Sequence, residues 1–118
     1  MSQIIATTLS NGSVSVPTAT VVNGSAKAWV NFNGTGTIAA RDSLNLSSLT
    51  DSGTGQYNVN FTNAFAATNY APSKCDNERG LGEVAAGSVS ASSMVVRSQS
   101  FSAADSSTVT HLAHGDLA

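Results

Sequence analysis

The chain contains two segments in which apolar and polar residues alternate, Ala28–Phe32 and Tyr57–Phe61. A period of two is typical of β-strands with one buried face, because successive side chains point to opposite sides of a sheet. In the first segment Val30 is expected to face the core and Trp29 to face away from it. In the second, the aromatic and valine positions share one face and the two asparagines share the other. The two segments therefore predict two strands that contribute to a common core.

The chain after residue 25 repeats this pattern of short alternating segments separated by turn-forming residues. Glycine and asparagine in Asn33–Gly36 and Asp51–Gly55 favour hairpin turns. Leucines between these turns indicate a short strand or a loop that directs them inward, and only residues 63–68 suggest a helical turn. Further strands are expected at Thr37–Arg41, before Pro72, and at Glu83–Val89, Ser92–Ser100 and Thr108–Leu112. Seven or eight short strands are typical of an antiparallel sandwich or barrel, and we expect one small, jelly-roll-like β-sandwich over residues 26–118.

Residues 1–25 differ from this pattern. They hold Asn-Gly pairs at positions 11 and 23, Pro17, and short β-branched patches. The alternation in Ser13–Pro17 indicates a strand that ends at the proline or lies at an edge. We expect an extended N-terminal arm that docks on another chain or supports trimerisation, because a domain this small cannot cover both of its faces. The alternative is a frayed terminus.

Charge and length limit the classes of function. The 118 residues are enough for one core. Only 10% of them are charged, against about 25% in ordinary soluble domains, so burial in an assembly is expected. The net charge of −2 and the scattered basic residues argue against nucleic acid. No apolar run is long enough to cross a membrane, so no membrane insertion is expected, and the first residues do not resemble a secretory signal.

The residue pattern predicts no catalytic, metal or cofactor site. On a strand, His111 and His114 point to opposite faces, so they are not expected to share a metal. A triad of His111 with Asp105 or Asp116 carries little information in a chain this rich in serine. The carboxylates at positions 76, 78 and 83 lie among basic residues, which favours a solvated charge cluster over a pair of glycosidase carboxylates. We therefore expect a protein that is not an enzyme.

The segment Ser73–Gly82 is distinct in composition. It holds four of the twelve charged residues and the only cysteine. We expect an exposed loop or hairpin tip, in which the cysteine is a thiol, although an intermolecular disulfide or a metal site are alternatives. If the protein binds a ligand through a surface loop, the candidates are Lys74, Cys75, Asp76, Glu78 and Arg79.

A longer ordered string resembles a known module. It consists of Lys27–Thr37, Ala40–Ser43, Leu46–Asp51 and Gly53–Thr62. This string is similar to the β-rich module found at the C-terminal end of tail fibres and fibre-like proteins of tailed bacteriophages, including cyanophages. The lead-in at Ser15–Thr18 and Val21–Ser25 also resembles the residues that commonly precede that module. The resemblance covers about Ser13 to Tyr70, and the sequence after Tyr70 departs from the pattern.

The resemblance implies a homotrimeric protein on the surface of a virion, assembled in the cytoplasm of a host bacterium. Because only about 25 residues precede the module, we expect a stand-alone version rather than a long fibre. The expected function is that of a short tail fibre or fibre-tip subunit that attaches to tail or baseplate proteins and contacts a glycan on the host surface. The alternatives are a capsid decoration protein bound to the major capsid protein and a free carbohydrate-binding module.

Trimer formation also follows from the strands. Alternating strands with little charge bury their second faces only against another subunit, and a closed threefold assembly covers several such faces at once. Sugar stacking on Trp29 or the other aromatic residues is the alternative use of such a face. The predicted interface residues are Trp29, Ile38, Leu44, Leu46 and Val95.

Overall fold

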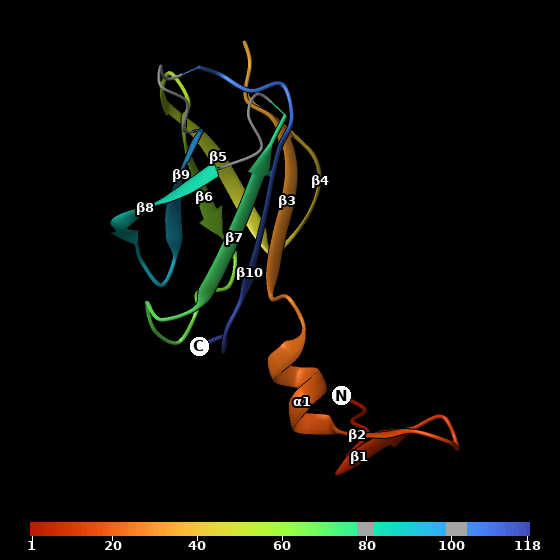
Figure 1. Cartoon of the computed structure of the whole chain (residues 1–118). Coiled ribbons are helices and arrows are strands. Elements are labelled where there is room, and N and C mark those ends of the chain that lie inside the picture. Colours follow the sequence, from red (N-terminus) through yellow and green to blue (C-terminus); the bar gives the residue numbers. More distant parts are fainter. Residues whose placement is uncertain (78–81, 99–103) are drawn as a thin grey trace.

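A computed structural model describes residues 1–77, 82–98 and 104–118 and contains two four-stranded antiparallel sheets packed face to face (Figure 1). The first sheet has the order β4 (Ala39–Leu44), β3 (Ala28–Asn33), β10 (Val109–His114) and β7 (Ala71–Asp76). The second has the order β5 (Leu46–Gly53), β6 (Gln56–Phe61), β9 (Ser93–Ser98) and β8 (Gly82–Val89). The predicted small all-β antiparallel fold is confirmed.

The strand order differs from a jelly roll. Three hairpins, β3–β4, β5–β6 and β8–β9, each stay within one sheet, whereas a jelly roll sends most consecutive strands to opposite sheets. The last strand, β10, lies between β3 and β7 and pairs with both. The jelly-roll detail of the prediction is therefore not confirmed.

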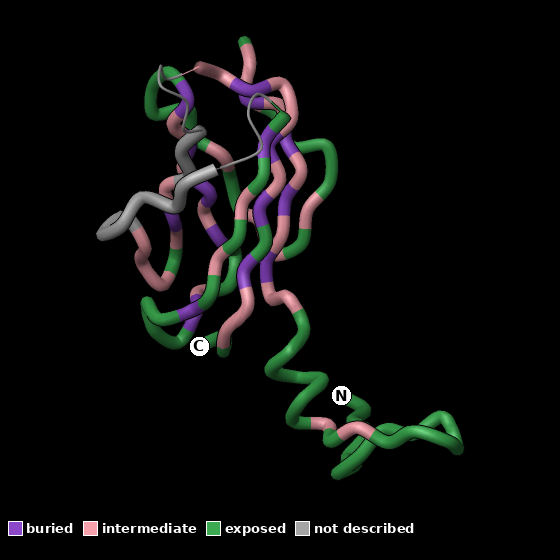
Figure 2. The backbone as a smooth tube through the Cα atoms, viewed as in Figure 1, coloured by how far each residue is buried: buried purple, intermediate pink, exposed green. Residues whose placement is uncertain are grey.

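The core lies between the two sheets, where the predicted alternating faces meet. Along β3 and β6 buried and half-buried residues alternate without exception. The ring of Phe32 meets the ring of Tyr57 edge to face, with 5.2 Å between centroids. At the other end of the sandwich, Phe65 stacks on Tyr70 at 4.2 Å. Figure 2 shows buried residues alternating with half-buried or exposed ones along the strands.

The chain passes from the first sheet to the second at Asn45, a single residue between β4 and β5. Its φ of 58° lies in the left-handed region, which asparagine tolerates better than most residues. The Asn45 side chain also satisfies both backbone groups of Asn63. Its Oδ1 accepts from the Asn63 N–H at 2.7 Å, and its Nδ2 donates to the Asn63 carbonyl at 3.0 Å. Asn45 therefore fixes both the direction of the chain and the contact between β5 and the residues after β6.

Replacing Asn45 by alanine is expected to lower the free energy of unfolding by about 1.5 kcal/mol, from the loss of two hydrogen bonds and the strain of positive φ. Urea unfolding measures the change. Asn45→Gly removes the hydrogen bonds but not the left-handed conformation, so its loss is expected to be smaller. Asn63→Ala is the matched control, since Asn63 contributes only its backbone to these bonds. Equal losses in all three variants would contradict this role of Asn45.

Residues 1–25 lie beyond one end of the sandwich (Figure 1). They form a small hairpin, β1 (Thr8–Ser10) with β2 (Ser15–Pro17), followed by the short helix α1 (Thr18–Gly24). The prediction of an arm that is extended throughout is thus not confirmed. Elsewhere in the chain, residues 63–68 form bends and not the predicted helical turn. The Cα radius of gyration is 16.3 Å, above the roughly 13.5 Å of a compact domain of this length, because this N-terminal segment stands apart from the sandwich.

Candidate assembly and binding surfaces

The outer face of the first sheet carries a continuous apolar row across three strands. Trp29 of β3 is paired with Leu44 of β4 on one side and with Leu112 of β10 on the other. The two leucines are 46% and 39% exposed, and the tryptophan is half-buried. Trp29 faces away from the core, as its position opposite Val30 predicts. Large apolar side chains side by side on an outer sheet face make this row a candidate contact surface.

A shallow groove of about 430 Å³ lies along this face, which we call the Trp29 groove. The side chains of its outer lining come from β3, β7 and β10: Trp29, Asn31, Ser73, Cys75, Thr110 and Leu112. Several polar groups here already have partners within the fold. Asn31 Oδ1 accepts from Arg41 at 3.1 Å, and Thr110 Oγ1 donates to the Cys75 carbonyl at 3.3 Å. The groove therefore offers mainly apolar surface to a partner.

The N-terminal segment (residues 1–25) exposes more large hydrophobic side chains than the described part of the sandwich does. Of the ten large hydrophobic side chains exposed in the described parts of the chain, seven belong to it. Ile4 and Ile5 are 96% and 92% exposed. The others are Met1, Leu9, Val14, Val21 and Val22. Exposed apolar side chains of this kind stabilise a structure only when another surface covers them, because burial removes them from water.

The other predicted interface residues lie in different places. Leu44 belongs to the apolar row beside Trp29. Val95 is half-buried on the outer side of the second sheet, where it pairs with Asn58. Ile38 and Leu46 are partly buried against the core of their own subunit. The structure therefore brings Trp29 and Leu44 together and leaves Val95 on the opposite side of the sandwich.

The predicted loop at Ser73–Gly82 begins as a strand. Lys74, Cys75 and Asp76 belong to β7, and the side chains of Lys74 and Asp76 point inward. Their Nζ and Oδ2 atoms lie 2.6 Å apart, with the side chains 0% and 2% exposed. The prediction that Lys74 and Asp76 are exposed binding residues is wrong, because the alternation of β7 places both side chains on its buried side. Cys75 faces out and is exposed. Glu78 and Arg79 lie outside the described residues.

His111 lies buried on β10 beside this ion pair and opposite Lys74. Its Nδ1 is 3.2 Å from the Ser73 carbonyl oxygen, which can only accept, so Nδ1 carries the proton. Its Nε2 is buried and has no hydrogen-bond partner among the described residues. Burial, together with the charge of Lys74, lowers the pKa of His111 to about 4. The imidazole is therefore neutral at physiological pH.

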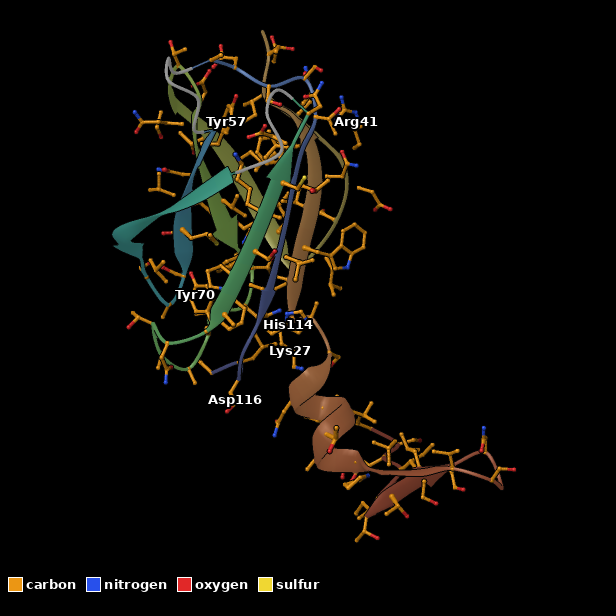
Figure 3. The ribbon with its side chains drawn as sticks, in the orientation of Figure 1. Lys27, Arg41, Tyr57, Tyr70, His114 and Asp116 are labelled. Carbon is orange, nitrogen blue, oxygen red and sulfur yellow. The ribbon has the colours of Figure 1, made fainter. Side chains whose placement is uncertain are left out.

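A polar pocket of about 530 Å³ lies where α1 meets the end of the sandwich. Its polar side chains come from the end of the helix, the loop before β7, the last residue of β10 and the residues after it: Asn23, Asn69, His114 and Asp116. Figure 3 shows His114, Asp116 and Tyr70 at this end of the sandwich. His114 and His111 are on opposite faces of β10, as predicted. The described residues contain no group of three His, Cys, Asp or Glu side chains arranged to hold a metal ion.

No protein family model, curated protein or solved structure matches this chain. Within the described residues, no helix has the length and apolar character needed to span a membrane. Inferences about function therefore rest on the residues themselves.

Sequence reasoning missed two parts of these surfaces. Leu112 was placed on a strand, but its contact with Trp29 depends on the pairing of β10 with β3, which sequence pattern does not reveal. The polar pocket joins Asn23 and Asp116, which lie at distant points of the chain. The signal available was the alternation of buried Val109, His111 and Ala113, which leaves Leu112 facing outward.

Proposed function

We propose that this protein is a structural protein of a bacteriophage virion, a short tail fibre or fibre-tip subunit displayed on the particle as a homotrimer. The observation that carries the proposal is the concentration of exposed apolar side chains in the N-terminal segment, outside the sandwich. The resemblance of Ser13–Tyr70 to the tail-fibre module supports it, as does the small all-β fold. The role is one of assembly and attachment rather than catalysis.

The energetics favour assembly. Burying one large aliphatic side chain contributes about 1.5–3 kcal/mol, so covering several of the seven in the N-terminal segment outweighs a substantial ordering cost. With 10% charged residues, the surface has few groups whose desolvation would oppose association. The Trp29 groove adds a second apolar surface on the sandwich itself.

A capsid decoration protein is the second candidate. It is favoured by the position of the N-terminal segment, which stands off one end of the sandwich (Figure 1). A segment placed in this way would dock on tail, baseplate or major capsid proteins while the sandwich faces outward. Contact with a host glycan would then fall to the sandwich and to the polar pocket at its junction with α1, which groups a carboxylate, an imidazole and two amides, one of them from Asn23 of the N-terminal segment. The same pocket would serve a free carbohydrate-binding module.

Incubation with phage particles tests the proposal. The purified protein is mixed with fibreless particles and, separately, with empty heads, and the particles are sedimented. Co-sedimentation with tails or baseplates is the expected result. Co-sedimentation with heads alone would establish decoration instead. A protein that adds to neither particle, and binds only free glycan, would contradict a virion role.

Replacing Trp29 by alanine is expected to weaken self-association by about tenfold or more, because a buried tryptophan at an interface is a common hot spot. Light scattering at falling protein concentrations measures the change in mass. Thr50→Ala, an exposed position on the second sheet, is the control and should leave the mass unchanged. An unchanged mass for Trp29→Ala with a lower melting temperature would show that the indole stabilises the monomer and not an interface.

A further inference from the structure

We infer that the N-terminal segment of one copy packs into the Trp29 groove of a second copy of this chain. The inference rests on the self-association in the proposed function and names the surfaces that make it. The structure leaves two apolar surfaces uncovered, the groove with its flanking leucines and the segment with seven exposed large side chains. The segment can cover the groove, and the groove can cover the apolar side chains of the segment.

The charges of the two surfaces match. Residues 1–26 contain no Asp, Glu, Lys, Arg or His. The outward-facing side chains of the groove are also uncharged, and Lys74, whose residue contributes to the lining, holds its ammonium 2.6 Å from the Asp76 carboxylate. The side chains of these two surfaces would therefore bury no unpaired charge, and burying such a charge is costly. The cation that lies against the lining, Arg41, donates to Asn31 Oδ1 at 3.1 Å and to the Ser107 carbonyl at 2.6 Å, so it sits at the edge of the groove and not among the lining side chains.

The hydrogen bonds of the groove favour a polypeptide over a saccharide. A sugar needs donors and acceptors that are free to bind hydroxyl groups. Here Asn31 Oδ1 is held by Arg41, and the Thr110 hydroxyl is held by the Cys75 carbonyl. An apolar chain needs few such groups. The isoleucine, valine and leucine side chains of the segment are apolar and need no such partners.

The junction with the sandwich directs the segment away from its own groove. The Lys27 N–H donates to the Ala113 carbonyl at 2.9 Å, which fixes the start of β3 to β10. The Lys27 ammonium turns back to the end of α1, where it donates to the Val22 carbonyl and, at 2.9 Å, to the carbonyl and hydroxyl of Ser25. A cation at this end of a helix binds its free carbonyls. Figure 3 shows Lys27 at this junction. The segment so held is positioned for the groove of another copy.

Cys75, the only cysteine of the chain, lines the groove and serves as a probe. Single cysteines are introduced into the segment at exposed positions, as Ile5→Cys and Leu9→Cys, and the full-length proteins are oxidised with copper–phenanthroline. Disulfide-linked dimers and trimers are expected on non-reducing gels, at a yield about tenfold or more above the control, since a docked thiol has a high effective concentration. Ser52→Cys, exposed on the second sheet, is the matched control, and the wild type reports linkage between two Cys75 thiols.

The outcomes separate this inference from the proposed function. An intrachain disulfide, seen as a faster-migrating monomer, would show that the segment covers its own groove and would overturn the inference. Linkage no greater than in Ser52→Cys would do the same. If light scattering of the same samples still gives an oligomer, the self-association of the proposed function stands and only this contact fails. A monomeric mass would overturn both.

Discussion

Replacing Gly34 by alanine is expected to destabilise the sandwich by about 3 kcal/mol. Gly34 is buried against the ring of Tyr57, and a Cβ at this position would overlap Cζ and Oη of that ring and lie 2.8 Å from Cε1. The ring has little freedom to move, because it is fully buried and its hydroxyl accepts the Ser106 N–H at 3.0 Å. Overpacking costs about 1–3 kcal/mol, and leaving the buried N–H without a partner adds about 1–3 kcal/mol.

Urea unfolding of Gly34→Ala measures this effect, and two other glycines provide controls. A Cβ at Gly36 meets no atom within 4 Å, but its φ of 61° strains an alanine by about 1 kcal/mol. A Cβ at Gly24 also meets nothing within 4 Å and carries no such strain, so Gly24→Ala should change stability little. In a Tyr57→Phe background the penalty of Gly34→Ala should shrink, since the hydroxyl is removed. A Gly34→Ala loss no larger than that of Gly36→Ala would contradict this packing.

Acidification is expected to lower stability by about 2 kcal/mol between pH 7.5 and pH 5.0 through His111 alone. Burial and the Lys74 charge lower the pKa of His111 in the folded state to about 4, from 6.5 in the unfolded chain. Below pH 6.5 the unfolded chain binds a proton that the folded chain does not accept. Unfolding is therefore favoured increasingly as the pH falls, and the loss levels off near pH 4. The physical origin is Nε2, whose protonation would place an unpartnered N–H and a positive charge beside Lys74.

Unfolding free energies across this pH range, measured for three proteins, test the effect. His111→Gln should remove most of the dependence on pH, whatever its stability at neutral pH. His114→Gln is the matched control on the opposite face of β10 and should keep the dependence of the wild type. A pH dependence that survives His111→Gln and disappears in His114→Gln would overturn the assignment.

The parts of the fold that the sequence predicts are those where local pattern and tertiary burial agree. In Ala28–Phe32 and Tyr57–Phe61 the period of two matches the buried faces residue by residue. The helix α1 was missed because Thr18–Gly24 is rich in β-branched residues, which favour strands. The available signal was Pro17 just before the helix and Gly24 at its end.

The candidate surfaces could be predicted only in part. The outward direction of Trp29 follows from its neighbours, but its pairing with Leu112 requires knowledge that the last strand, β10, lies beside β3. For Lys74 and Asp76 the sequence predicts a solvated cluster, because acidic and basic residues lie close together in Ser73–Gly82. The structure buries them together, since β7 places both on one face where each neutralises the other. The compensation between these charges is predicted by their closeness in sequence, whereas their burial depends on tertiary geometry and is not visible in composition.

Light scattering of the full-length protein after size exclusion tests the central claim most directly. Self-association through the uncovered apolar surfaces predicts a particle of three times the 11.9 kDa chain mass, stable on dilution. A mass of one chain at all concentrations would contradict the account, because the N-terminal segment and the Trp29 groove would then remain uncovered in solution.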